Sequence, residues 1–186
     1  MSRTDTISRT MHDVGLAAWF GGSLMGAVGV NAAAGDVDDP AQRARVANSG
    51  WGRWTPVNAA AIGAHVLGAL EMTWANKKRL KDQKGVGSAS LVKAGLTAAA
   101  LGATAYSRVL GQKVMNAGDV PVAGGTEPLP STPEDVAKAQ QQLKALQWVI
   151  PALTGSMLGM NSLMGEQQRP RKVARGVGGR LRSLAS

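Results

Sequence analysis

The strongest candidate for chemistry in this chain is His65, which lies near the middle of a largely apolar segment, 54–74. An ionisable side chain at the centre of a membrane crossing is costly, so it marks a candidate functional site. One interpretation is a transport or proton-relay site. The other is a neutral imidazole that hydrogen-bonds a carbonyl or a hydroxyl on a neighbouring helix, with three candidate hydroxyls: Ser23, Thr97 and Thr104.

A second group of ionisable residues gathers at one end of the apolar segments. Asp13, Glu71 and Lys93 belong to different segments but fall near the same boundary. We expect Lys93 to pair with Glu71 or Asp13 and so hold the helices in register, with a transport site as the alternative. The second histidine, His12, is expected at this boundary too, at a different depth from His65, so a haem with two histidine ligands is not expected.

The chain carries no recognisable catalytic constellation. It has no cysteine, which excludes disulfides and thiolate chemistry. It also lacks a phosphate-binding loop, a GxSxG elbow, an HExxH motif and histidines paired at metal-binding spacing. We therefore expect no enzymatic activity, no cofactor and no metal. A membrane-bound redox or lipid enzyme is the least favoured hypothesis.

Four segments are long and apolar enough to be interpreted as membrane-spanning helices: 14–34, 54–74, 89–110 and 145–165. The third is the weakest, because only 94–107 is free of charge and Lys93 and Arg108 must reach outward to the interfaces. The expected fold is an all-α integral membrane bundle of four transmembrane helices, occupying residues 1–168.

The charges fall asymmetrically between these segments. The net charge is +9, and all of it lies in 1–13, 71–93 and 166–186, while the other connections are neutral. Lysine and arginine stay on the cytoplasmic face during insertion, so both termini are expected inside, in the inner (plasma) membrane. The mean hydropathy of −0.07 is low for a membrane protein and keeps a soluble helical bundle open as an alternative.

Small residues recur at four-residue spacing in the expected spans, and such stripes let helices approach closely in lipid. They offer faces for helix packing or for a partner, and we expect Gly22 and Gly26 to be such a partner face. The residues singled out are Gly22, Gly26, Gly63, Gly68, Gly155 and Gly159. All five tryptophans fall near expected span ends, where indole rings favour the membrane interface. Asn31, Asn58 and Gln147 are expected to make helix-to-helix hydrogen bonds.

The connections carry several local signals. Asp38-Asp39-Pro40 is expected to cap a short helix, and Pro56 to lie in the first turn of the second span. The connection 111–131, with three prolines, is interpreted as an extended linker. The last helix is expected from 133 to about 165, with a kink at Pro151.

The tail, 169–186, is basic and is expected to form an amphipathic or disordered cytoplasmic segment. It contains six basic residues and no acidic one. Such a tail fits anionic lipid better than nucleic acid, because no aromatic side chain accompanies the charge. The residues expected at the lipid surface are Arg171, Lys172, Arg175, Arg180 and Arg182.

The segments Trp19-Phe-Gly-Gly-Ser-Leu-Met-Gly26 and Pro56-Val-Asn-Ala-Ala-Ala-Ile-Gly-Ala-His65 resemble small, Ala/Gly-rich, four-span inner-membrane proteins of actinobacterial type, themselves uncharacterised. This resemblance, in style across the whole chain, implies an accessory subunit of a larger membrane complex such as a transporter or a respiratory assembly. The first functional hypothesis is accordingly a non-enzymatic accessory or scaffold subunit. The second is a small oligomeric transporter or channel with His65 at its midplane.

Overall fold

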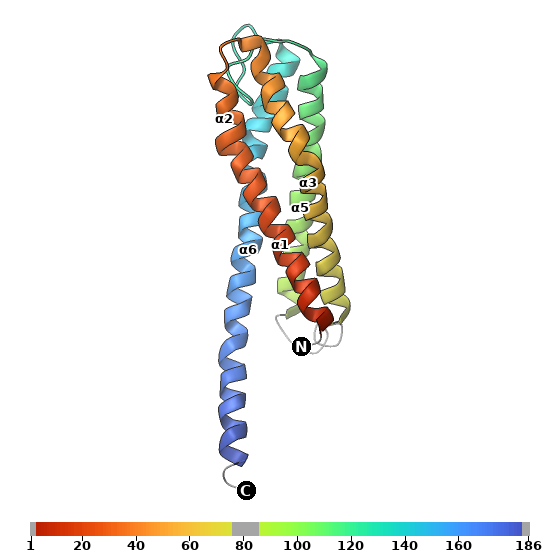
Figure 1. Ribbon diagram of the computed structural model, residues 1–186, viewed down its shortest axis with the longest axis vertical. Helices are drawn as coiled ribbons and strands as arrows, with labels where there is room; N and C mark the ends of the chain where they lie inside the picture. Colours follow the sequence, from red (N-terminus) through yellow and green to blue (C-terminus); the bar gives the residue numbers. More distant parts are fainter. Residues whose placement is uncertain (1–2, 76–85, 184–186) are drawn as a thin grey trace.

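The computed structural model describes residues 3–75 and 86–183, with side chains described from 6 to 75 and from 88 to 163. The chain forms four helical rods that run side by side: α1 (Arg3–Met25), α3 (Pro40–Ala75), α5 (Val86–Asn116) and α6 (Glu134–Ser183) (Figure 1). α1 continues through η1 (Gly26–Val30), α2 (Asn31–Ala33) and η2 (Ala34–Asp36). Within these described ranges there is no β-strand, and the expected all-α class is confirmed.

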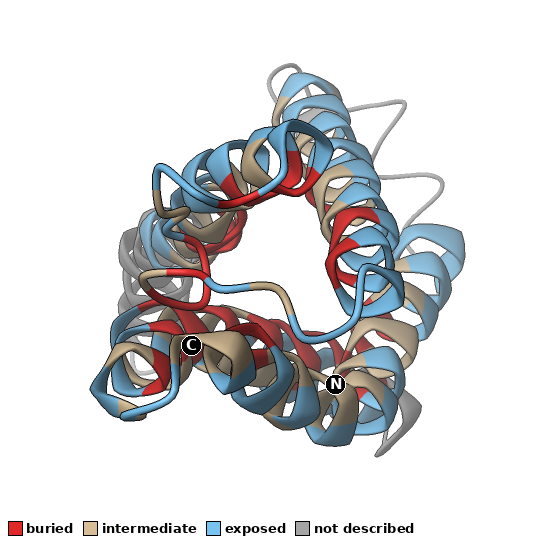
Figure 2. Cartoon of the chain, turned by 90° about the horizontal axis from the view of Figure 1, so that it is seen from above, coloured by how far each residue is buried: buried red, intermediate tan, exposed pale blue. Residues whose placement is uncertain are grey.

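The helices form an open ring. α1 packs against α3 and α6, and α5 packs against α6, whereas α3 and α5 meet over few residues. Viewed along the bundle, the buried residues face the inside of this ring (Figure 2). The C-terminal half of α6 extends well past the ends of the other helices (Figure 1).

α3 is one continuous helix where the sequence suggested two. Asp39 caps its first turn, with its carboxylate 3.0 Å from the amide nitrogen of Ala41, as expected. The helix then runs uninterrupted to Ala75, so Pro56 lies inside it and not in a first turn. A proline removes one backbone donor, and membrane or core helices tolerate this where packing holds both flanks. Here Trp51 and Trp54 anchor the helix against α1.

Two glycines bring α1 and α3 into backbone contact. A β-carbon on Gly15 would come closer than 3.0 Å to the backbone of Ala61 and His65 in α3. A β-carbon on Gly68 would collide in the same way with the backbone of Ser8 and His12 in α1. Only glycine permits this approach. The two helices are thereby fixed in one antiparallel register.

The connection between α5 and α6 is packed, so the expectation of an extended linker is wrong. Val122 is fully buried in a core cluster with Leu110 and Val114 of α5 and Val136 of α6. The Thr132 hydroxyl donates to the carbonyl of Pro121, at 2.7 Å, and accepts from the amide of Leu129. These contacts close the connection over one end of the ring.

The tail continues α6 as backbone helix through Ser183, with no break after residue 168. The side chains of Arg171, Lys172, Arg175, Arg180 and Arg182 lie outside the residues whose side chains are described, as does the basic connection 76–85. The expected lipid-facing pattern of the tail therefore stays a prediction.

One helix in the described part of the chain, Thr6–Asp36, is long and apolar enough to cross a membrane. Helices in the cores of soluble proteins and signal sequences meet the same criterion. By this criterion residues 3–75 and 86–183 contain one candidate span, and the arrangement of four spans is not established.

Gly68→Ala should destabilise the bundle by about 1–3 kcal/mol, because the added methyl group has no space beside the backbone of α1. Gly63→Ala is the matched control in the same helix, since nothing lies within 4 Å of its added β-carbon. The control should be neutral or stabilising by up to about 1 kcal/mol. Unfolding in mild detergent, followed by circular dichroism, measures both; equal effects would contradict the close approach.

Candidate functional site

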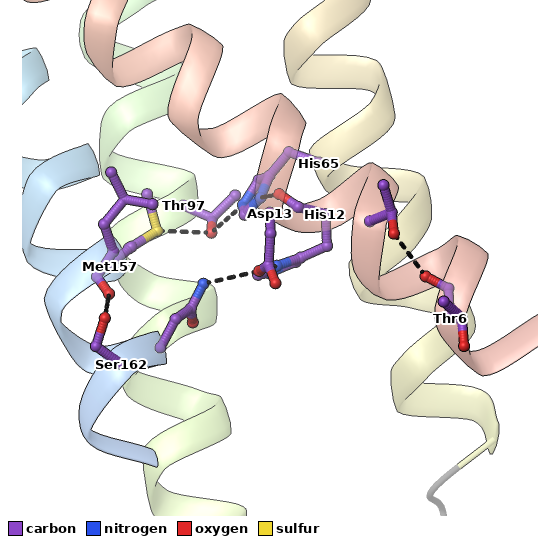
Figure 3. A network of polar contacts seen from close by, with 10 residues as sticks. Thr6, His12, Asp13, His65, Thr97, Met157 and Ser162 are labelled. Carbon is purple, nitrogen blue, oxygen red and sulfur yellow. Dashed lines mark hydrogen bonds and ion pairs between the residues drawn. The ribbon is translucent and has the colours of Figure 1, made fainter. Parts of the chain in front are cut away.

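His65 lies at the centre of a buried polar network. Its side chain is 1% exposed, and its ring lies 4.4 Å, centroid to centroid, from that of His12. Its Nδ1 is 3.1 Å from the carbonyl oxygen of His12, and its Nε2 is 3.4 Å from Oγ1 of Thr97 (Figure 3). Of the three hydroxyls considered from sequence, Thr97 is the partner. Trp19 donates to Thr104, and Ser23 donates to its own helix.

The partners determine where the protons lie. A carbonyl oxygen can only accept, so Nδ1 of His65 carries a hydrogen and donates it to His12. In a neutral imidazole, Nε2 is then an acceptor that faces the Thr97 hydroxyl, whose single hydrogen is also within reach of the Lys93 carbonyl at 2.9 Å and of the Met157 sulfur at 3.2 Å. Nδ1 of His12 donates to the carboxylate of Asp13, at 2.8 Å, for the same reason.

We call this group the His65 network: His12, Asp13, His65, Thr97, Met157 and Asn161. The amide of Asn161 donates to Asp13 at 3.2 Å, and Thr97 Oγ1 lies 3.2 Å from the sulfur of Met157. The members come from α1, α3, α5 and α6, so all four helices meet at this point (Figure 3). The network ties together helices whose apolar faces alone would allow several registers.

The expected depth of His12 is wrong. α1 begins at Arg3, well before the apolar segment, and its antiparallel register against α3 brings His12 level with His65. The sequence signal for this lay in Gly15, which shares a helix face with Gly22 and Gly26 and so extends their stripe toward the N-terminus.

Lys93 does not form the expected salt bridge at contact distance with Asp13 or Glu71, although all three side chains are described. Asp13 is near enough to attract the Lys93 ammonium electrostatically. The carboxylate of Asp13 accepts from His12 and Asn161, and that of Glu71 accepts from the Ser8 hydroxyl. Lys93 lies on α5, which shares few contacts with α3, the helix of Glu71.

The small-residue faces divide into covered and open ones. Gly22 and Gly26 face the indole rings of Trp54 and Trp51, so this surface is covered by α3 and is not a partner face. Gly155 packs against Phe20 of α1. A β-carbon added at Gly63 or at Gly159 would meet nothing within 4 Å, and the same is true of Gly95 and Gly102 on α5.

The tryptophans divide in the same way. Trp19 is fully buried, and Trp51 and Trp54 fill the space over the α1 glycines. These three indoles face the inside of the bundle, and the expected position of the tryptophans at a membrane interface stays a prediction. Trp74 and Trp148 remain exposed, at 71% and 51%.

The other half of the ring, toward the packed connection, contains a cavity of about 240 Å³. A chain of hydrogen bonds forms part of its wall: Nε1 of Trp51 donates to Asn31, and the amide of Asn31 donates to Gln147, both at 2.8 Å. The helix-to-helix bonds expected of Asn31 and Gln147 are therefore present. No pattern in the sequence indicates the cavity itself, because its walls come from separate helices and a connection.

The His65 network offers little to a reaction. A hydroxyl beside an imidazole can act as a nucleophile, but only where a substrate can reach both groups. His65 is buried and does not line the cavity. Among the residues whose side chains are described, no three histidine, cysteine or acidic side chains lie together as metal ligands would.

No protein-family model matches the sequence, and neither the curated proteins nor the solved structures give a match. The functional argument therefore depends on the geometry of this chain alone.

Thr97→Val should destabilise the bundle by about 1–3 kcal/mol, because it leaves Nε2 of His65 buried without a partner. Ser156→Ala is the control: that hydroxyl is exposed and bonds only to a carbonyl of its own helix. The control should change stability by less than about 0.5 kcal/mol. Thermal unfolding in detergent compares the two, and an unaltered Thr97→Val protein would show that the network contributes nothing to stability.

Proposed function

We propose that this chain is an integral membrane protein with four crossings that serves as a non-catalytic accessory or scaffold subunit of a larger membrane assembly. The observation that carries the proposal is the polarity of the bundle. Its exposed middle is uncharged, while several of its polar side chains point inward.

The uncharged surface extends over all four helices. On α1 every exposed residue between Asp13 and Asp36 is apolar, and the same holds on α3 between Arg53 and Glu71. On α5 and α6 the corresponding stretches, 94–107 and 145–163, expose no charge. The large exposed apolar side chains within these stretches are Val14, Met25, Val28, Val57, Leu67, Leu70, Tyr106, Trp148, Val149 and Leu163.

The buried interior mixes apolar side chains with polar ones. Its two core clusters are hydrophobic, but His12, Asn31, His65 and Thr154 are also each less than 9% exposed. A water-soluble bundle exposes charge along its outer faces. An uncharged outer surface with hydrogen bonds inside suits a hydrocarbon solvent, in which helix contacts come from small residues and internal hydrogen bonds.

The uncharged stretches differ in how much of a membrane's hydrocarbon core they can cross. Residues 14–35 on α1 extend about 33 Å, enough for the hydrocarbon core. Residues 94–107 on α5 extend only about 21 Å, so Lys93 and Arg108 would reach toward the interfaces along their aliphatic stems. The charge asymmetry supports cytoplasmic termini, and the basic tail would then lie against anionic lipid.

An accessory role is favoured over transport by the state of His65. It is packed against His12 and hydrogen-bonded on both ring nitrogens, with no contact to the cavity. A transport site at that depth would need water or substrate to reach the imidazole. The open small-residue face of α5, formed by Gly95, Ala98, Ala99 and Gly102, is a surface on which a helix of a partner protein could approach closely.

Because the chain has no native cysteine, its topology can be tested with single cysteines. Asp38→Cys should react with a membrane-impermeant maleimide in intact cells, and Ala75→Cys should react only after permeabilisation. Both positions are exposed and lie at opposite ends of α3. A soluble protein would leave both cysteines unlabelled in intact cells, and labelling of Ala75→Cys alone would reverse the proposed orientation.

The partner face can be tested by purification from native membranes through a C-terminal tag. Gly102→Leu should release the co-purifying complex, because the new side chain keeps a partner helix away from α5. Gly21→Leu is the matched control, an equally open glycine on α1. If the wild-type chain purifies alone, or if the two variants behave identically, the assembly role through α5 is wrong.

A further inference from the structure

The cavity in the half of the bundle next to the packed connection has the features of a binding site. Its walls come from α1, α3, α5 and α6, and Gly125 and Thr126 of the packed connection close its end. Three indoles line it, those of Trp19, Trp51 and Trp54. α3 and α5 share few contacts, and the half of the ring near His65 contains the His65 network.

The neighbouring turn of α1 is shaped to support this wall. Over Gly26–Val30 the helix widens to a π turn, in which the amide of Asn31 donates to the carbonyl of Gly26 five residues earlier. Such turns interrupt regular helices mainly at functional sites. Here the Asn31 carbonyl receives the amide of Gly125 at 3.3 Å, so the turn fastens the connection over the cavity.

Several polar side chains of the lining are satisfied within the protein. The Asn31 and Gln147 amides bond to each other, and the hydroxyls of Thr55 and Ser107 bond to their own helices. Oδ1 of Asn58 has no partner among the described residues, but it has almost no accessible surface. It therefore belongs to the packed wall, and an occupant of the cavity does not reach it.

One edge of the cavity is exposed and positively charged. Three residues line the cavity and are also exposed at the surface of the bundle: Ala59 of α3, and Ala105 and Arg108 of α5. The guanidinium of Arg108 makes no hydrogen bond or ion pair with any residue that the structure describes. An anionic group at this edge would meet an uncommitted fork of donors that suits a carboxylate or a phosphate.

The volume limits what can enter. A water molecule takes up roughly 30 Å³ of liquid, and a methylene group is similar in size, so the cavity holds about eight to ten heavy atoms. A complete membrane-lipid chain is about twice as long. Apolar, aromatic walls favour hydrocarbon over water as the occupant.

We propose that this cavity binds a medium-chain anionic amphiphile of about eight to ten carbons. Its chain lies among the three indoles, and its carboxylate or phosphate head lies at Arg108. This site is separate from the proposed assembly role: it needs no partner protein, and the α5 face can fail its test while the site binds.

Tryptophan quenching by 10-bromodecanoate tests the proposal in the full chain, held in phosphatidylcholine nanodiscs. Trp74→Phe and Trp148→Phe remove the two exposed indoles and leave the three that line the cavity. Quenching should saturate and should be competed by decanoate but not by hexadecanoate. Quenching that rises linearly with concentration, or equal competition by both chain lengths, would overturn the proposal, since either result indicates partition into the bilayer only.

Arg108→Gln should raise the Kd about tenfold, because it removes the charge at the edge. Arg53→Gln is its control, an exposed arginine that does not line the cavity. Ala105→Trp should abolish saturable quenching by filling the cavity. Ala59→Leu on the opposite edge repeats the test should Ala105→Trp fail to fold. Retained binding in a folded blocking variant would contradict the assignment.

Competition identifies the head group. Decanoate and decyl phosphate are compared as competitors of 10-bromodecanoate, and failure of both to compete would exclude an anionic head.

Discussion

The backbone contact between α1 and α3 is the constraint from which the rest of the bundle follows. Gly15 and Gly68 let the two helices touch at two points along their length, where any side chain would collide with the opposite backbone. Two such points fix both the register and the separation of the pair. His12 then lies against His65, and the rings of Trp54 and Trp51 lie over Gly22 and Gly26. α5 is left to pack against α6, and the ring stays open between α3 and α5.

This arrangement divides the interior into two unlike halves. Near His65 the helices are close, and the space is filled by imidazoles, a hydroxyl and a thioether that bond across all four helices. Toward the packed connection the indoles and amides line the ring without filling it, and a cavity remains. The first half has the character of a structural lock, and the second has the room and the unpaired groups that recognition requires. The residue most suggestive of chemistry in the sequence thus belongs to the half that is least accessible.

The outer surface of the bundle suits a membrane environment better than water. The exposed middle of the bundle carries no charge and would be costly to expose to water. The glycines on its open faces pack against nothing in the described part of the chain. In a bilayer both features become favourable, because hydrocarbon solvates the apolar side chains and small residues invite close helix contact. The helical class, the exposed middle and the charge asymmetry all favour the same environment, although only α1 has the length and hydropathy of a crossing by itself.

Local features of the fold could be predicted from the sequence, because they depend on neighbours along the chain. The Ala-rich periodic segments are helical, and Asp39 caps α3. What the sequence could not determine depended on residues far apart meeting in space. The carboxylate of Asp13 accepts hydrogen bonds from His12 and Asn161, and Lys93 does not form the expected salt bridge with it. Val122 is buried by α5 and α6, which turns an apparent linker into a cap. Trp51 and Trp54 face inward because Gly26 and Gly22 of the facing helix leave room for their indole rings. A glycine stripe in the sequence shows that another helix can approach closely, but not which helix. Only the tertiary structure shows that this helix is the chain's own α3, because register and separation are properties of two helices together.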